Sequence, residues 1–274
     1  MQYQAIRPDV LVFVGDSHLS VATAFVDGDD VLLVDALGSM EDALAMRQVL
    51  CAEMGKTVRI IAATHYMSDH LAAMRLFPDA MTIAHRHHRL GFQMQNRPAH
   101  ATYRAPKLVF DAAMTLHWGA HELRFVHNPG RTPDHVSVDV PTADLVCAGD
   151  NIVGHIVYVS RADPAMLRQA IAAMRRFGRG TVVGGHMGCF PAAVLEDAIH
   201  YLDRLQRRAI EVHARVPAAE IAAALARIRI EDCIATGVEP TDFEREWHGH
   251  NLEAMASQSL FALDAALQAR EARA

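Results

Sequence analysis

Apolar residues recur along the chain in two patterns, short uninterrupted runs and longer stretches with a helical period. The short runs are bounded by Gly, Asp or Pro and are typical of strands. They predict strands at residues 10–14, 20–26, 31–34, 58–63, 81–84, 108–110, 114–117, 122–126, 136–140, 144–147 and 181–183. Helical spacing predicts helices at 40–54 and 164–177, the second with Pro164 in its first turn, where a missing N–H is tolerated. Strands mixed with helices indicate an α/β protein.

Beyond Pro191 the pattern is helical, with interruptions near Pro217, 237–240 and Gly249. Ala and Leu recur with helical spacing in this part of the chain, so its helices each have an apolar face. We expect residues 191–274 to form a helical extension that packs on the same domain. The same apolar faces offer a surface for a homodimer.

The composition restricts the classes of partner. The 274 residues are 51% hydrophobic and carry a net charge of −6, without a basic stripe. This balance argues against nucleic acid or a membrane surface as a partner and favours a small-molecule substrate. No apolar run is long enough to cross a bilayer, and the start of the chain lacks a signal-peptide pattern, so we expect a cytoplasmic protein. The four cysteines form no Cys-x-x-Cys pair and are expected to be free thiols.

Candidate metal ligands cluster directly after the predicted strand at 58–63. His65, Asp69 and His70 lie in the segment His-Tyr-Met-Ser-Asp-His. Imidazole nitrogen and carboxylate oxygen are ordinary ligands of zinc and of non-haem iron. A buried strand that ends in such a segment can hold its side chains rigidly around a cation.

Three later segments place further polar side chains after predicted strands. Arg131 lies in Pro-Gly-Arg-Thr, Asp150 follows a glycine, and His186 lies in Gly-Gly-His-Met-Gly. The neighbouring glycines allow the backbone to approach a site closely. We therefore expect these segments to meet the first cluster in the folded chain.

Taken in order, the four segments resemble the metallo-β-lactamase superfamily. That family carries His-x-His-x-Asp-His after a strand, followed by Pro-Gly-His-Thr, Gly-Asp and Gly-His-Gly, and the resemblance extends from about Val10 to Gly188. It implies a four-layer αββα sandwich of two mixed β-sheets with flanking helices. This catalytic domain would occupy residues 1–190, with the helical extension at residues 191–274.

The resemblance also implies two neighbouring metal sites. The first would be held by His65 and by histidines at positions 67 and 131. The second keeps all of its ligand types in this chain, and these are Asp69, His70 and His186, with Asp150 touching one or both metals.

The first site has lost two of its histidines, because Met67 and Arg131 occupy their positions. In one interpretation only the second metal binds, and the permanent charge of Arg131 holds a substrate carboxylate or an oxyanion. In another, His127 rebuilds the first site with His65 and Asp150, and Met67 is a weak thioether donor or a wall. In a third, the altered site selects iron or manganese and performs redox chemistry.

The favoured function is a metal-dependent hydrolase, in which a metal-activated water attacks an ester, lactone, thioester, amide or phosphoester. The expected cofactor is one or two zinc ions, with iron or manganese as the alternative. Asp69 or Asp150 would orient the water or take its proton, and Arg131 would clamp the substrate. Two alternatives stay open: a non-haem iron oxidoreductase on the same scaffold, and a non-catalytic ligand-binding protein with a degenerate site.

Other side chains are candidates for contacts with the substrate. His155 and Tyr158 follow the Gly-Asp segment in a predicted loop, and Met67 lies within the first motif. His85 opens the run His-Arg-His-His, which is either an accessory metal or substrate site or a solvated loop. Trp247 and the polar residues after it are candidates for a substrate wall or a subunit contact.

Overall fold

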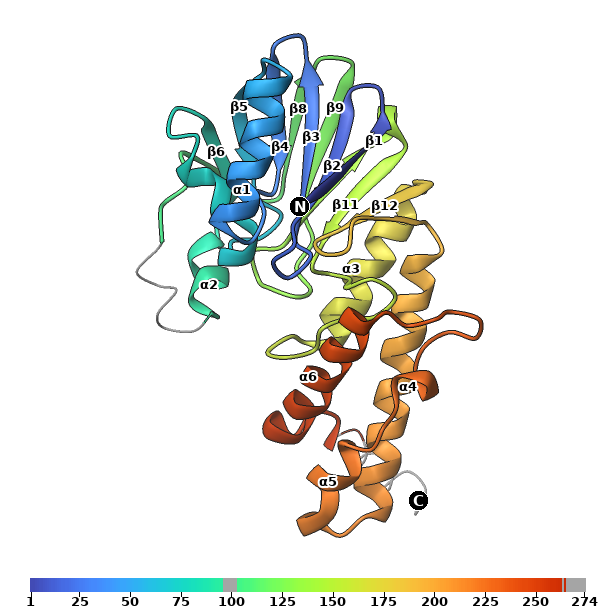
Figure 1. Ribbon diagram of the computed structural model, residues 1–274. Helices are drawn as coiled ribbons and strands as arrows, with labels where there is room; N and C mark the ends of the chain where they lie inside the picture. The colour runs from blue at the N-terminus through green and yellow to red at the C-terminus, as the bar shows by residue number, and fades with distance from the viewer. Residues whose placement is uncertain (96–102, 263, 265–274) are drawn as a thin grey trace.

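The computed structural model describes residues 1–95, 103–262 and 264. Its strands form two mixed sheets, with helices on the outer sides and a helical arm toward the C-terminal end (Figure 1). The first sheet is antiparallel from β1 to β4 and parallel from β4 to β7. In spatial order its strands are β1 (Gln2–Arg7), β2 (Val10–Val14), β3 (Val21–Asp27), β4 (Asp30–Val34), β5 (Thr57–Ala62), β6 (Met81–His85) and β7 (Leu108–Phe110).

The second sheet is antiparallel except for the pair β11 and β12, which is parallel. In spatial order its strands are β13 (Cys189–Pro191), β12 (Thr181–Gly184), β11 (Leu145–Gly149), β10 (Val136–Val140), β9 (His121–His127) and β8 (Ala113–Trp118). All of the strands predicted from the apolar runs are present in the two sheets.

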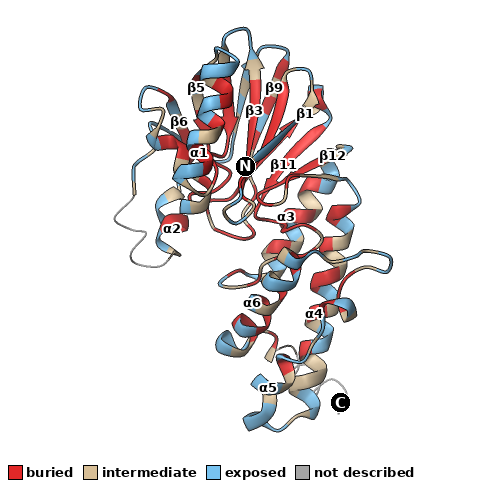
Figure 2. Cartoon of the chain, in the orientation of Figure 1, coloured by how far each residue is buried: buried red, intermediate tan, exposed pale blue. Residues whose placement is uncertain are grey.

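Buried residues line the strands of both sheets and the inner sides of the helices (Figure 2). Between the sheets lies a cluster rich in valine, in which Phe25 and Phe125 are buried. The outer face of the first sheet packs against α1 (Met40–Arg47), and that of the second against α3 (Pro164–Phe177) and α4 (Val194–Arg215). Because side chains alternate between the two faces of each strand, each sheet serves two such clusters. The predicted αββα sandwich of two mixed sheets is confirmed.

The helical arm shares the hydrophobic cluster of the second sheet. Leu252 and Met255 are buried in the same cluster as Val182 of β12. Besides α4, the arm contains α5 (Ile221–Leu225) and α6 (Asp242–Gln258). The predicted interruption at Gly249 is wrong, because α6 continues through it. A glycine inside a helix costs only about 1 kcal/mol relative to alanine, less than burial of the apolar face of α6 supplies.

The predicted helix at 40–54 is present but is not uniform. It begins after Ser39, whose hydroxyl accepts a hydrogen bond from the backbone N–H of Asp42, and α1 ends at Arg47, where a π-helical turn begins.

The remaining helix is α2 (His88–Gln93). The short helical turns are Gln48–Glu53, Ser68–His70, Ala72–Arg75, Pro141–Ala143, Ala218–Glu220 and Ile230–Asp232. No helix in the described ranges has both the length and the apolar character needed to cross a membrane.

The segments singled out by the sequence meet at one edge of the sandwich. His65 follows β5, Asp150 follows β11 and His186 follows β12, while the turn Ser68–His70 carries the rest of the first motif. Parallel neighbours such as β11 and β12 end at the same edge. A bridge between Ser20 and His186 ties the loop after β12 to the first sheet. The edge therefore joins both sheets.

Candidate metal centre

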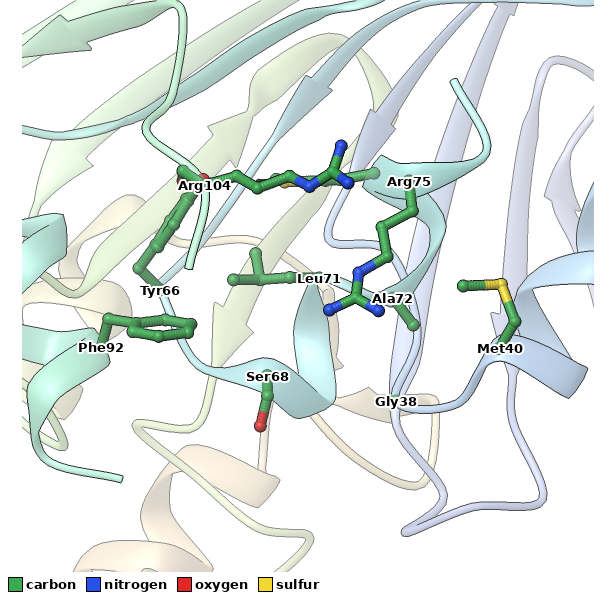
Figure 3. Close-up of a pocket in the computed structure, with 10 residues that line it drawn as sticks. Gly38, Met40, Tyr66, Ser68, Leu71, Ala72, Arg75, Phe92 and Arg104 are labelled. Atoms are coloured by element: carbon green, nitrogen blue, oxygen red, sulfur yellow. Dashed lines mark hydrogen bonds between the residues drawn. The ribbon is translucent and has the colours of Figure 1, made fainter. Parts of the chain in front are cut away.

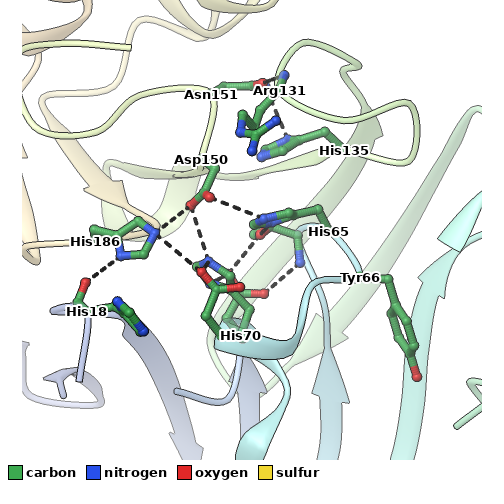
Figure 4. Close-up of polar contacts among 12 residues, drawn as sticks. His18, His65, Tyr66, His70, Arg131, His135, Asp150, Asn151 and His186 are labelled. Atoms are coloured by element: carbon green, nitrogen blue, oxygen red, sulfur yellow. Dashed lines mark hydrogen bonds and ion pairs between the residues drawn. The ribbon is translucent and has the colours of Figure 1, made fainter. Parts of the chain in front are cut away.

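Asp69, His70, Asp150 and His186 form a compact group, called here the tetrad. Figure 4 shows His70, Asp150 and His186 pointing toward one another. Each offers one ligand atom, and the four atoms lie within 4.8 Å of one another. Asp150 Oδ1 lies 3.2 Å from His70 Nε2 and 3.3 Å from His186 Nε2. Asp69 Oδ2 lies 3.6 and 3.8 Å from the same two nitrogens. The chain thus brings two imidazoles and two carboxylates to one point.

The backbone fixes which nitrogen His186 presents to the tetrad. Its Nδ1 lies 2.6 Å from the carbonyl oxygen of His18. Because a carbonyl only accepts, Nδ1 carries a proton, and Nε2 is the nitrogen that faces Asp150. A ring N–H held by a backbone carbonyl is the usual support of a metal-binding histidine.

Asp35 supports the first motif from behind. It accepts hydrogen bonds from the backbone N–H of Thr64 at 2.7 Å and from the Thr64 hydroxyl at 2.8 Å, and its Oδ2 lies 3.6 Å from His70 Nδ1. Since the Thr64 hydroxyl gives its proton to Asp35, it accepts from His65 Nδ1, which lies 3.0 Å away. His65 Nε2 is left free and faces Asp150 Oδ2 at 3.4 Å.

Two glycines allow the close approach of these loops. A Cβ on Gly185 would lie 2.1 Å from Asp150 Oδ1, so any side chain there would push the carboxylate away. Gly149 has φ +51°, and a Cβ there would lie 2.6 Å from the ring of His135. Asp35 itself has φ 60°, a conformation that is strained for a residue with a side chain and that occurs often at functional sites.

The charges of the tetrad depend on one another. Burial opposes ionisation of Asp150, but His186 and His70 outweigh it and hold the pKa of Asp150 well below its usual range. Burial likewise opposes protonation of His70, but Asp150 and Asp69 raise its pKa well above the ordinary value. Such mutual perturbation of buried groups is characteristic of functional sites.

Several ligand-type atoms of this group lack a conventional partner. Within the described part of the chain, no hydrogen bond reaches the buried Nε2 atoms of His65, His70 and His186 or the buried Oδ1 of Asp150. A buried polar atom without a partner costs about 1–3 kcal/mol. The donor set of nitrogen and carboxylate oxygen suits zinc or another divalent transition metal. The residues present therefore fit the cation that the sequence predicts.

His135 is a buried neighbour of the centre that the sequence analysis missed. Its ring stacks on His65 with centroids 5.0 Å apart, and the Asn151 side-chain amide donates to its Nδ1 at 3.1 Å. Burial and the nearby His65 hold the pKa of His135 well below its ordinary value, so the ring is neutral. The only sign of it in the sequence is its position, four residues after Arg131 and shortly beyond the Pro-Gly-Arg-Thr segment.

Arg131 is buried beside the tetrad. Its guanidinium lies over the ring of Tyr158, 4.6 Å from the centroid, and donates to the carbonyl of Ser160 at 2.9 Å. Its Nε has no hydrogen-bond partner among the described residues. Burial lowers the pKa of Arg131, while Asp150 raises it. A cationic side chain is thus buried beside the tetrad.

A cavity of about 660 Å³ opens beside the tetrad. Its wall combines cations, carboxylates, thioethers and aromatic rings. The lining includes Met67, Asp69, Arg131, Asp150, Tyr158, Arg161, Phe243, Trp247 and His250. The rings of Trp247 and His186 are 5.7 Å apart, so α6 forms one wall of the site.

A smaller pocket of about 200 Å³ lies beside the first motif, whose Tyr66 and Ser68 contribute to its lining (Figure 3). Leu71, Phe92 and Tyr66 line it, with Arg75 and Arg104 at its rim. No tetrad residue lines this pocket. The larger cavity is therefore the one that can bring a substrate to the tetrad.

Three other candidates lie apart from the tetrad. His155 donates its backbone N–H and ring Nδ1 to Glu244 Oε1, at 2.7 and 2.9 Å, and supports α6. His127 does not reach the tetrad: its Nε2 donates to the carbonyl of Pro133 at 2.9 Å, and its ring stacks on His85. Neither His85 nor His127 lines the larger cavity.

Comparisons with known proteins identify the family of the chain. The family model of the Metallo-beta-lactamase superfamily matches residues 13–186. An atrochrysone carboxyl ACP thioesterase from Pseudocercospora fijiensis is 26% identical over 132 residues, which are 47% of this chain and 35% of that protein. This chain therefore aligns with about a third of the thioesterase's length.

Solved structures share the fold. A metallo-beta-lactamase from Pontibacter korlensis superposes with a TM-score of 0.63 at 16% identity, covering 74% of this chain and 98% of that one. The inverting sec-alkylsulfatase Pisa1 from Pseudomonas sp. superposes with a TM-score of 0.68 at 16% identity, covering 94% of this chain and 50% of the sulfatase. The family and its hydrolase relatives support a hydrolase in general terms. The family match over more than half of the chain shows that this protein belongs to the metallo-β-lactamase superfamily.

Proposed function

We propose that this protein is a metal-dependent hydrolase with a single divalent cation, most simply zinc, held by the tetrad. The observation that carries the proposal is the convergence of four ligand atoms within 4.8 Å at the wall of a 660 Å³ cavity. Buried nitrogens and an oxygen without hydrogen bonds support it, because a cation would satisfy them.

Each residue has a separate task in this proposal. A cation bound by the tetrad supplies Lewis-acid polarisation of the scissile group and acidifies water. Asp69 is the more exposed of the two carboxylates and lines the cavity, so it can orient the attacking water and accept its proton. Asp150 is buried between the histidines and serves as a ligand. His65 lies beside that carboxylate, with its free Nε2 3.4 Å from Asp150 Oδ2.

Arg131 and the aromatic wall define the class of substrate. The guanidinium is fixed by Tyr158 and Ser160 and faces the cavity, where Arg161 adds a second cation. A buried arginine binds carboxylate, sulfate or phosphate groups in a fixed geometry. Trp247 and Phe243 favour an apolar portion beside that anion. We propose a substrate that combines an anionic group with an apolar part.

The test is hydrolysis of a panel of thioesters, esters, lactones, amides, phosphoesters and sulfate esters. Thioesters and sulfate esters are tested first, because a thioesterase and an alkylsulfatase are among the similar proteins. Activity should disappear on chelation, return with zinc, and be lost in His186→Ala but not in His117→Ala, which changes an exposed histidine of β8. Hydrolysis that survives both chelation and His186→Ala would exclude the tetrad as its centre.

A second candidate uses the same residues. Two histidines and one carboxylate, such as His70, His186 and Asp150, are also the ligand set of non-haem iron oxygenases. This alternative predicts bound iron and substrate-dependent oxygen consumption. Neither observation is expected of a zinc hydrolase. Identification of the bound metal and measurement of oxygen consumption therefore distinguish the oxygenase from the hydrolase.

A further inference from the structure

Three histidines outside the tetrad form a second cluster, called here the histidine triad. His85 is the last residue of β6, His127 is the last residue of β9, and His87 lies in the turn before α2. Each ring offers one nitrogen, and the three nitrogens lie within 4.8 Å of one another. The triad joins the ends of strands from both sheets. It has no role in the hydrolysis proposed above.

The buried member of the triad has a free ring atom. His85 is 1% exposed, and within the described residues no hydrogen bond reaches its buried Nε2. The nearest carboxylate oxygen, Asp111 Oδ1, is 3.9 Å away on a side chain that is 70% exposed.

His127 is oriented as a ligand would be. Its Nε2 donates to the carbonyl of Pro133, so Nδ1 keeps its lone pair. Metal-binding histidines commonly have their other nitrogen held in this way. The ring of His87 is nearly perpendicular to that of His85, at 86° with centroids 4.8 Å apart. The triad therefore presents three rings from two backbone segments, the end of β6 with the turn after it and the end of β9.

We propose that the histidine triad is an accessory zinc site, with three imidazole ligands and a fourth position open to solvent. Its all-nitrogen ligand set differs from that of the tetrad and suits Zn²⁺ or Cu²⁺ rather than Mg²⁺ or Ca²⁺.

Binding requires a local rearrangement. His85 and His127 are stacked, with an interplanar angle of 8° and centroids 3.7 Å apart, so their lone pairs lie in parallel planes and one ring must tilt to share an ion. Tetrahedral zinc would draw the ligand nitrogens to about 3.3 Å from one another. Binding through His85 Nε2 also requires the ring proton to move to Nδ1. Nδ1 then loses the long 3.3 Å hydrogen bond that it accepts from the His87 N–H.

The experiment isolates the triad by removing the tetrad. Metal-stripped Asp69→Ala/His186→Ala protein is equilibrated with zinc, and bound zinc is measured per chain by elemental analysis after dialysis against a weak chelator. We expect one zinc per chain. Adding His87→Ala and His127→Ala should reduce this to none, whereas His117→Ala should leave it unchanged. X-ray absorption of the bound zinc should show imidazole ligands without a protein carboxylate.

The converse variant covers the case in which the tetrad-deleted protein does not fold. His87→Ala/His127→Ala in the otherwise unchanged protein should lose one zinc per chain and retain its hydrolytic activity. The proposal is overturned if the tetrad-deleted protein folds and binds no zinc, or if the bound zinc is unaffected by removal of His87 and His127. In either case the triad is a packing cluster. Because the first assay uses a protein without the tetrad, its outcome is independent of the proposed hydrolysis.

Discussion

Glu244 is the residue through which α6 is fixed against the catalytic edge. The side chain is fully buried, and its two oxygens accept four hydrogen bonds. Oε1 accepts from the backbone and ring of His155, at 2.7 and 2.9 Å. Oε2 accepts from the backbone and hydroxyl of Thr241, both at 2.9 Å. Glu244→Gln replaces one of these oxygens with an amide nitrogen that cannot accept.

The expected cost follows from the number of donors left without an acceptor. Two donors would face the amide nitrogen, and a hydrogen bond to a charged group contributes about 1.5–3 kcal/mol. Rotation of the Thr241 hydroxyl recovers part of this, so we expect a loss of about 3 kcal/mol in the free energy of unfolding. Since α6 also carries Trp247, the affinity for substrate should fall as well.

Urea unfolding followed by circular dichroism and tryptophan fluorescence measures this loss. The matched control is Glu253→Gln in the same helix, because that side chain is 81% exposed and its replacement should change stability by less than about 0.5 kcal/mol. If the two variants unfold at the same urea concentration, Glu244 does not anchor α6 and the reasoning fails.

The pH dependence of this loss has a definite sign. The hydrogen bond to Glu244 raises the pKa of His155 above 6.5, so its contribution is complete below pH 6.5 and disappears as pH rises through the raised value. Burial opposes the charge of Glu244, but His155 and Thr241 lower its pKa below 4.5, so its contribution is complete above pH 4.5 and disappears in acid. The difference between wild type and Glu244→Gln should be largest between these values.

Three further predictions concern the centre and its supports. Arg131→His should add one bound zinc per chain by elemental analysis, because it removes a buried positive charge and restores a nitrogen near His65; an unchanged count would mean that the position does not correspond to a metal site. Asp35→Ala should weaken zinc binding by about 10–100-fold in a chelator competition, since it frees Thr64 and removes a contact of His70; unchanged affinity would contradict a supporting role. Gly154→Ala should destabilise the protein by about 1–3 kcal/mol in urea, because the added Cβ would lie 2.4 Å from Glu244 Oε1 at φ +59°; wild-type stability would show that the loop can move aside.

The sequence predicts the strands and the tetrad because both depend on local patterns. The apolar runs predict the strands because residues of a buried strand are apolar. Residue types that bind metals lie directly after three of these runs, in the first motif, at Asp150 and at His186. The common edge follows from parallel pairing of strands. These features need no knowledge of distant contacts.

Features that depend on distant contacts were not predictable. His127 follows a strand like the tetrad residues, yet the carbonyl of Pro133 and the ring of His85 hold it elsewhere. His155 faces Glu244, which lies 89 positions later in the chain, and no local pattern reveals that pairing. The continuity of α6 through Gly249 depends similarly on packing against the second sheet.

The most direct test of the tetrad is a zinc count with the histidine triad removed. Metal-stripped His87→Ala/His127→Ala protein is reconstituted with zinc and compared with the same protein carrying His186→Ala. The account predicts one zinc per chain in the first protein and none in the second, with hydrolysis lost in parallel. No zinc in either protein, or a count that His186→Ala leaves unchanged, would contradict a catalytic cation held by Asp69, His70, Asp150 and His186.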